Sequence, residues 1–280
     1  MPVTKTPEEL SAIADPAERA RLATELLAEH QSLVIRLAQI RRQAVAELRA
    51  SGLSYAQVAE RLGVTRGRIA QLKTSTLERE FFAGPMVTIA TPLRATHESR
   101  PLVAQEDVEA AMMLTRFLNA ADVATKLQHI SPTGEIDLSP DALLAICGPK
   151  SSTAVQRLIT ADPLLEFRTD DAERWTIIDR ASGMVYSSPI DDDPAADRDF
   201  AYVARLPRAD SEHPILVIAG IHAIGSLGAA SYLADAANLR KLHRAVGKRP
   251  FSMIVESQFT RSPLATLSAR LAVEPRTHHA

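Results

Sequence analysis

Residues 53–73 constrain the fold of this chain more than any other segment, and they read LSYAQVAERLGVTRGRIAQLK. Ser54 suits the N-cap of a short first helix, and Thr65 suits the N-cap of a second one. Gly63 stands between them, where the chain needs a positive φ angle. Apolar side chains are expected to face inward from both helices and from the corner: Val58, Ala59, Leu62, Val64, Ile69 and Leu72. This pattern predicts a helix-turn-helix.

The outward side of the second helix is polar and basic. A helix of this kind fits the major groove of double-stranded DNA. Arg66 or Gln71 would read base edges, because bidentate donors match guanine and glutamine matches adenine. Lys73 and the flanking arginines would hold phosphates. The predicted DNA-contacting residues are Ser54, Thr65, Arg66, Gly67, Arg68, Gln71, Lys73 and Arg42.

The charge distribution agrees with this prediction. Between Arg36 and Arg79 the chain has nine Lys or Arg residues and three acids, which is a local charge of +6. Since the total formal charge is -2, the remaining residues sum to -8. A basic segment attached to an acidic body is typical of DNA-binding proteins.

The remainder of residues 1–80 is also predicted to be helical. Thr6 suits the cap of a short helix over 7–13. Asp15 and Pro16 begin a long helix that continues to Ala50, where Gly52 favours its end. The apolar residues of the long helix either pack on the helix-turn-helix or form a homodimer interface, and the sequence leaves both open.

The segment from Arg42 to Lys73 resembles region 4 of sigma-70-family factors and the actinobacterial sigma-like regulators. This resemblance implies that the motif reads a promoter element and that RNA polymerase is a possible partner. No credible sigma region 2 accompanies it, so promoter melting is not expected. The alternative is a helix-turn-helix used for protein contacts alone.

Residues 81–280 are predicted to form a second domain of strands and helices. Helices are expected over 7–13 and 16–50 in the first domain and over 106–127, 152–159 and 223–239 in the second. Strands are expected over 86–93, 142–147, 164–168, 175–179, 184–187, 200–206, 215–219 and, last, 251–259. Buried strands alternating with helices favour a three-layer α/β, Rossmann-like domain with a mostly parallel or mixed sheet. The whole chain is therefore predicted to be a multidomain α+β protein.

Two glycine-containing turns follow the two most apolar strands. Ligands of open α/β sheets bind beyond the carboxyl ends of the strands, and both turns would lie there if the strands are parallel neighbours. Neither turn has Walker A or Gly-x-Gly-x2-Gly spacing, and an ordinary turn is the alternative for each. The predicted ligand-binding residues are Gly148, Pro149, Lys150, Ser151 and Ser152 in the first turn, and Gly220, His222, Gly225 and Gly228 in the second.

Several other kinds of site are not expected. Cys147 is the only cysteine, which excludes an internal disulfide, and it is expected in the core. Asp191–Asp193 are expected to form an exposed loop and not a metal site, and His278-His279 a disordered tail. Residues 214–234 have no charge, but their glycines favour a buried strand, a turn and a helix over a membrane span. No signal peptide is expected, and the predicted location is the cytoplasm, at the nucleoid.

Together these features predict a DNA-binding transcriptional regulator, working as a homodimer without a membrane segment. The second domain is expected to sense a small ligand, and its two turns favour a nucleotide effector or another phosphorylated metabolite. Two alternatives stay open. One is a nucleotide-acting enzyme with a DNA-binding head, and the other is a scaffold that contacts RNA polymerase. No catalytic residues and no metal ligands are assigned.

Overall fold

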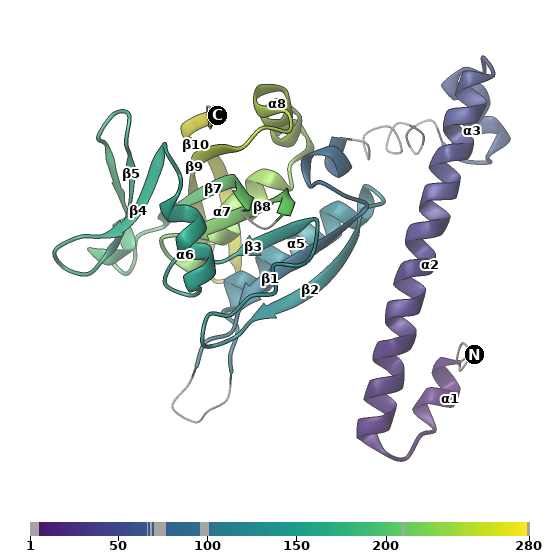
Figure 1. Ribbon diagram of the computed structural model, residues 1–280, viewed down its shortest axis with the longest axis horizontal. Helices are drawn as coiled ribbons and strands as arrows, with labels where there is room; N and C mark the ends of the chain where they lie inside the picture. Colours follow the sequence, from purple (N-terminus) through teal and green to yellow (C-terminus); the bar gives the residue numbers. More distant parts are fainter. Residues whose placement is uncertain are drawn as a thin grey trace. The chain divides into compact units, whose positions relative to one another are not determined.

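A computed structural model describes residues 6–65, 67, 69, 77–95, 101–208 and 211–278 of the chain. The chain divides into two compact units, Met1–Lys73 and Thr74–Ala280, which are described one at a time. The first is helical and the second is rich in β-sheet, so the protein has a mixed α+β architecture (Figure 1).

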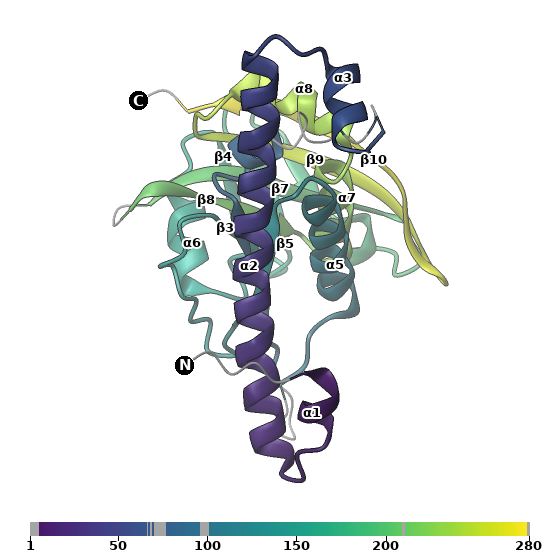
Figure 2. The same ribbon diagram turned by 90° about the vertical axis from the view of Figure 1, so that its right-hand side faces the viewer.

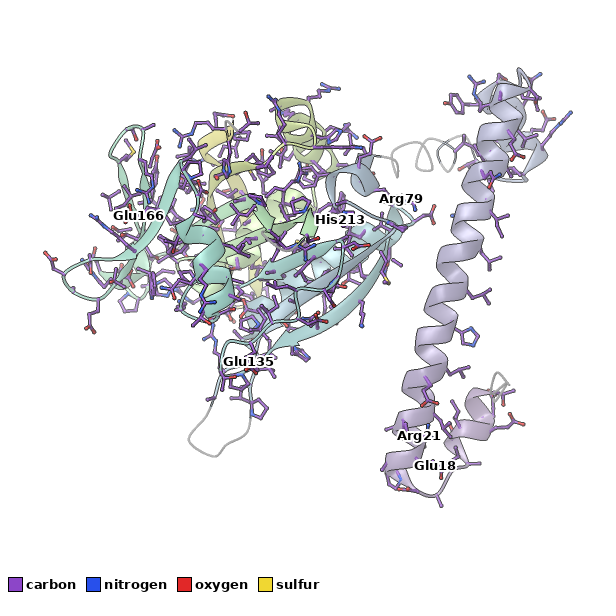
Figure 3. The ribbon with its side chains drawn as sticks, viewed as in Figure 1. Glu18, Arg21, Arg79, Glu135, Glu166 and His213 are labelled. Carbon is purple, nitrogen blue, oxygen red and sulfur yellow. The ribbon has the colours of Figure 1, made fainter. Side chains whose placement is uncertain are left out.

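The first unit contains helices α1 (Pro7–Ser11), α2 (Pro16–Ala50) and α3 (Tyr55–Arg61). The predicted caps are present: Thr6 caps α1 in a capping box with Glu9, and the Asp15 carboxylate accepts a hydrogen bond from Ala17 N at 3.0 Å. Helix α1 folds back beside the first turns of α2 (Figure 2). There Arg21, which is labelled in Figure 3, forms a 2.6 Å ion pair with Glu25.

The second unit contains a seven-stranded sheet in the order β10-β9-β7-β8-β3-β1-β2 and a three-stranded sheet in the order β4-β5-β6. Strands β2, β1, β3 and β8 are parallel, and β7, β9 and β10 continue the sheet in antiparallel pairs. The strands are β1 (Met86–Pro92), β2 (Ala124–Ile130), β3 (Leu143–Ile146), β4 (Leu165–Thr169), β5 (Trp175–Asp179), β6 (Val185–Ser187), β7 (Arg198–Arg208), β8 (Ser211–Gly220), β9 (Phe251–Arg261) and β10 (Leu264–Thr277).

Both faces of the large sheet are covered, which explains the nearly continuous apolar runs in its central strands. Leu144 and Ile146 of β3 face a core formed with helices α5 (Gln105–Ala120), α7 (Ala223–Leu233) and α8 (Ala236–Val246). Leu143 and Ala145 face the opposite core, formed with α6 (Thr153–Thr160) and the small sheet. Successive side chains of a strand point to opposite faces, so one strand contributes to both cores.

The Rossmann-like prediction is not confirmed. Only β1 and β2 are joined by one crossover helix, α5, and the connection of residues 131–142 between β2 and β3 has no helix. The β7, β9 and β10 part of the sheet is antiparallel, whereas a doubly wound fold is mostly parallel. The broader prediction of a mixed sheet between apolar layers agrees with the observed topology.

Three predicted boundaries in the second unit are wrong. The helix expected over 106–127 ends at Ala120, Asp122 takes a φ of +55°, and Ala124–Ile130 form β2 beside β1. The helix expected over 223–239 is two helices, because Asp235 accepts hydrogen bonds from Ala237 N and Asn238 N and so begins α8. Strand β9 is not the last strand, since β10 pairs with it.

The carboxyl terminus also differs from expectation. His278 was predicted to lie in a disordered tail, but its Nε2 lies 2.6 Å from Ser252 Oγ and its side chain is only 9% exposed. Asp162, which is fully buried, joins the same cluster through Tyr202 and Ser252. This cluster fixes the end of β10 in the core, and His279 lies outside the described residues.

Residues 77–81 are helical and belong to the second unit, and Phe81 lies in its core. Phe81 is 1% exposed and packs against Phe251, with ring centroids 6.1 Å apart. Buried Arg205 crosses above both rings and donates from Nη2 to Phe81 O at 2.7 Å. It also donates from Nη1 to the carbonyls of Gly247 and Arg249. A single guanidinium therefore connects three chain segments.

The uncharged stretch of residues 214–234 is the expected strand, turn and helix, formed by most of β8 and by α7. Among the described residues, no helix combines the length and the apolar character that crossing a bilayer requires.

Candidate functional site

The first helix of the predicted motif begins where the sequence indicates. The Ser54 hydroxyl accepts a hydrogen bond from Gln57 N at 3.3 Å, and Gln57 Oε1 accepts one from Ser54 N at 2.8 Å. This reciprocal capping box satisfies two backbone donors that would otherwise lack partners at the start of α3.

The turn after α3 also agrees with the sequence. Gly63 has a φ of +61°, a conformation that side chains with a Cβ rarely adopt. The chain then reverses, and Val64 N donates to Ala59 O at 3.0 Å. Beyond the turn, residues 67 and 69 are helical and Ile69 N donates to Thr65 O at 3.2 Å. A second helix therefore follows Thr65, as predicted.

A small core joins this motif to α2. Val58, Ala59 and Ile69 are 0%, 3% and 1% exposed. Partly buried residues pack around them: Val45 and Leu48 from α2, and Leu53. The carboxyl-terminal end of α2 is therefore part of the motif's core. Packing on the motif, one of the two roles predicted for this helix, is observed.

Two inward positions were predicted wrongly. Leu62 and Val64 are 39% and 37% exposed. Leu62 is the C-cap residue of α3, beyond its last regular turn, and Val64 belongs to the reversing turn. Val45 and Leu48 of α2 are among the partly buried residues that do pack on the motif's core.

The predicted DNA-contacting residues are only partly within the described structure. Ser54 caps α3, Thr65 precedes the second helix, and Gly67 lies in that helix. Arg66, Arg68, Gln71 and Lys73 lie outside the described residues, as does Leu72, and so does the side chain of Arg42. Their DNA contacts therefore stay predictions.

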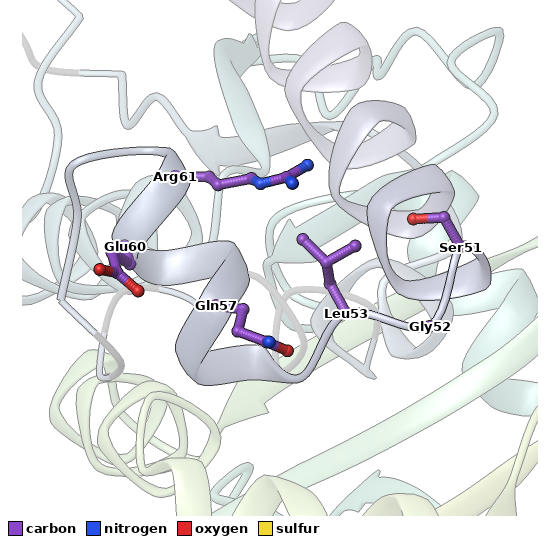
Figure 4. A pocket seen from close by; sticks show the side chains of 6 residues that line it. All are labelled: Ser51, Gly52, Leu53, Gln57, Glu60 and Arg61. Atoms are coloured by element: carbon purple, nitrogen blue, oxygen red, sulfur yellow. The ribbon is translucent and has the colours of Figure 1, made fainter.

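A groove of about 520 Å³ lies where α2 ends and α3 begins (Figure 4). Arg49, on α2, places its guanidinium 4.2 Å from the centre of the Tyr55 ring and so fixes the two helices at this junction. The groove is lined by Ser51, Gly52, Leu53, Gln57, Glu60 and Arg61. Sequence reasoning did not identify this groove.

Comparison with known families agrees with this geometry, because residues 25–79 match the family model described as sigma-70, region 4. Residues 25–79 are a helix-turn-helix DNA-binding region of this type. The matched segment is longer than Arg42–Lys73, the segment for which the sequence predicted the resemblance. It includes more of α2 and reaches into the helical residues 77–81. Comparisons with curated proteins and with solved structures gave no match for the chain.

The second predicted site lies at the carboxyl edge of the parallel strands. Strands β3 and β8 are parallel neighbours, which is the condition for their two turns to meet. Lys150, in the first turn, donates from Nζ to Ile221 O in the second at 2.9 Å. Desolvation of the ammonium group, followed by the charge of Arg94, lowers the pKa of Lys150. The two turns are therefore in direct contact.

The hydroxyl of Ser152 has a structural role. Ser152 caps α6 and is 2% exposed. Its Oγ donates to Gly134 O at 2.7 Å, which ties the first turn to the loop before β3. Gly148, Pro149 and Ser151 complete this turn, and Ser151 N donates to Gly148 O. Cys147 lies in the core as predicted, where burial raises the pKa of its thiol to about 12.

The glycines of the second turn allow close packing of α7. A Cβ on Gly220 would lie 2.1 Å from His222 O, and one on Gly228 would lie 2.1 Å from Ser257 Cβ on β9. A Cβ on Gly225 would lie 2.6 Å from Asp199 Oδ2. The need for glycine at these positions therefore follows from packing alone.

The amino terminus of α7 already holds a carboxyl side chain. Asp199 is fully buried, and its Oδ2 accepts hydrogen bonds from His222 N at 3.0 Å and Gly225 N at 3.1 Å. These donors are the ones that a phosphate would use at a helix start. The His222 ring does not cap α7; its Nε2 lies 2.9 Å from Asp191 Oδ1. Asp191 lies in a short 3-10 helix, so it is not part of a simple exposed loop.

Sequence reasoning missed several charged residues of this edge, among them Arg94 after β1, Asp107 in α5 and Asp199 in β7. Asp107 has a side chain only 5% exposed, and Arg94 Nη2 lies 3.8 Å from its Oδ2. Burial raises the pKa of Asp107 to about 7, although the charge of Arg94 opposes the change. No motif marks these residues, because each becomes significant only when the strands are assembled.

The raised pKa of Asp107 predicts a pH dependence of stability. The folded protein keeps this proton between about pH 4 and about pH 7, whereas the unfolded chain has released it. Stability should therefore fall as the pH rises through this range, by roughly 1.4 kcal/mol for each pKa unit. Asp107→Asn should remove the effect and be the more stable protein at pH 7, by about 2 kcal/mol or more.

Urea unfolding at pH 4 and pH 7 tests this prediction. Trp175 is the single tryptophan and lies in β5, so its fluorescence reports on the second unit. An equal stability difference between the wild type and Asp107→Asn at both pH values would contradict a raised pKa.

Proposed function

We propose that the protein is a DNA-binding transcriptional regulator that contacts promoter DNA through its region 4 segment. The match over residues 25–79 supports this proposal most strongly. The capping box at Ser54, the positive φ of Gly63 and the small core around Ile69 support it independently. The local excess of Lys and Arg favours a polyanionic partner.

RNA polymerase is a second proposed partner, since region 4 segments are associated with both promoter DNA and polymerase. A protein that contacts polymerase alone would retain the fold of the motif but would bind isolated DNA weakly. The DNA-binding experiment below therefore separates a regulator from a scaffold.

We also propose that the protein acts as a homodimer through α2. Leu33, Leu37 and Ile40 are 48%, 56% and 63% exposed. Their spacing of four and three residues places them on one side of the helix, as in the seam of a coiled coil. Two copies would present two helix-turn-helix motifs to a two-fold symmetric operator.

For the second unit we propose small-ligand sensing. Support comes from a cleft of about 340 Å³ at the carboxyl edge of the sheet, a usual location for ligands in α/β proteins. The glycine turns do not favour a nucleotide, because Asp199 occupies the donors of α7 that a phosphate would need.

The test is fluorescence anisotropy of the full chain on DNA from upstream of its own gene, titrated with salt. We expect sequence-selective binding that weakens steeply as salt rises, because neutralised phosphates release counterions. Arg66→Ala/Arg68→Ala should weaken binding by about tenfold to a hundredfold, since it removes one base or phosphate contact per arginine. Binding stoichiometry in the same titration reports whether two copies bind each operator.

The control is Arg116→Ala/Arg168→Ala, which removes the same charge from exposed positions of the second unit. Its affinity should stay within about twofold of the wild type, because long-range charge effects are screened at physiological salt. Equal losses in the two double variants would mean that net charge alone attracts the DNA. No selectivity over a scrambled duplex would contradict the proposed function.

A further inference from the structure

We propose that the cleft at the carboxyl edge of the sheet binds a small metabolite through an anionic group, a phosphate or a carboxylate. The anionic group specifies the ligand class of the proposed sensing unit. Only the effect of the ligand on DNA binding rests on the proposed function. The cleft is lined by Arg94, Gln105, Glu106, Ile190, His222, Ala223, Ile224, Arg261 and Leu264. Of these residues, sequence reasoning identified only His222.

The topology places the cleft where a ligand site is expected. From β1 the chain crosses through α5 to β2 on one side, while β3 lies on the other side of β1. Helix α5 covers one face of the sheet, and α6, which follows β3, covers the other. The cleft lies beyond the carboxyl ends of β1 and β8, and its lining includes the residues that follow these two strands. Ligands of open α/β sheets bind at this edge.

The directions of β7 and β9 place two other charged residues at this edge. Strand β9 runs parallel to β8, since both are antiparallel to β7, so Arg261 at the end of β9 lies at the edge where β8 ends. Asp199, at the start of β7, lies there as well. Four separated chain segments thus bring charged side chains to one small region.

Two arginines favour an anionic ligand. The guanidinium of Arg94 is about half exposed, and within the described part of the chain it has only the long 3.8 Å approach to Asp107. Arg261 lies over the Phe259 ring and donates from Nη1 to Ala196 O at 3.0 Å, which holds it in place. Guanidinium donors match carboxylate and phosphate oxygens in geometry as well as charge.

The walls around the arginines limit the rest of the ligand. Gln105 begins α5, a helix of 16 residues for which the described structure shows no side-chain cap, and the backbone N–H groups at its start add to the positive potential. Ile190, Ile224 and Leu264 provide an apolar wall. A volume of about 340 Å³ lies near the lower end of ligand pockets, which favours a small metabolite over a dinucleotide.

Two acids, one partly exposed and one buried, limit which anions the cleft can bind. Glu106 lines the cleft and Asp107 lies behind Arg94, so the pocket is not a general anion trap. An entering anion has to compete with Asp107 for Arg94.

The experiment is isothermal titration of the full chain with inorganic phosphate, and separately with malonate, against sodium chloride of equal ionic strength. We expect saturable binding of at least one probe, and the stronger of the two identifies the anionic group. Arg94→Gln and Arg261→Gln should each raise the dissociation constant at least tenfold. Arg116→Gln, on the exposed side of α5, should leave it within twofold.

A second measurement does not depend on the variants. In spectra of the protein with ¹⁵N-labelled arginine, the Nε signals of Arg94 and Arg261 should move on titration with the bound probe. No saturable binding of either probe, or binding that is equal in the Arg94→Gln and Arg116→Gln proteins, would overturn the site. If the probe binds but the affinity for DNA does not change, the site is supported and ligand sensing is contradicted. If the probe binds but the protein does not bind DNA, only the proposed regulator function is contradicted.

Discussion

Replacing Gly228 by alanine is expected to destabilise the second unit by about 3 kcal/mol or more. The added Cβ would lie 2.1 Å from both Cβ and Oγ of Ser257, so α7 would have to move away from β9. Overpacking a buried contact costs about 1–3 kcal/mol, and it costs more when the obstructing atom is close to the backbone. The measurement is the free energy of unfolding in urea, followed by Trp175 fluorescence.

A compensating substitution makes this prediction specific. Ser257→Gly removes both obstructing atoms, and the next contact of the new Cβ would be Ser257 Cα at 3.6 Å, an ordinary separation. The double variant Gly228→Ala/Ser257→Gly should therefore recover most of the lost stability, less about 1 kcal/mol for glycine in a strand. A double variant as unstable as Gly228→Ala would show that packing on Ser257 is not the reason for glycine there.

The second large effect is expected at Arg205. Arg205→Met should cost about 3 kcal/mol, because the carbonyls of Phe81, Gly247 and Arg249 lose their donor inside the protein. An unpaired buried acceptor costs roughly 1–3 kcal/mol, and methionine restores only apolar contact with Phe81 and Phe251. Although burial lowers the pKa of Arg205 to about 10, the group stays charged at neutral pH.

Arg205→Lys is the matched comparison. Lysine keeps the charge and part of the donor capacity but lacks the planar fork, so it should recover part of the loss and no more. Urea unfolding gives both values. If Arg205→Met were as stable as Arg205→Lys, hydrogen bonding to the three carbonyls would not be what this residue contributes.

Local signals were sufficient to predict the helix-turn-helix. The capping residue Ser54 and the left-handed Gly63 act within a few residues of their own positions, so the local sequence determines them. The same holds for Asp15 at the start of α2. The predicted cap at Thr65, which precedes the second helix, stays a prediction. Apolar runs likewise located β3 and β8, whose side chains are buried on both faces.

Features that depend on distant partners were missed. Strand β2 was predicted as the end of a helix, because its partly exposed residues become a strand only through pairing with β1. Strand β10 escaped detection for the same reason, since β9 provides its partner. Asp199 and Arg94 are ordinary residues in the sequence, and only strand order brings them to one edge. Secondary structure that tertiary pairing imposes is the part that periodicity does not reveal.

The helical residues 77–81 have a consequence for how this protein can be divided. The family match ends at residue 79, within these residues of the second unit, and Phe81 just beyond it is buried. A fragment cut at the family boundary would leave the α/β unit without Leu77 and Glu78, which pack on its core or lie buried in it. Expression fragments and chimaeras with other DNA-binding modules should therefore be joined before Thr74, where the second unit begins, so that residues 77–81 stay with the sheet that holds them.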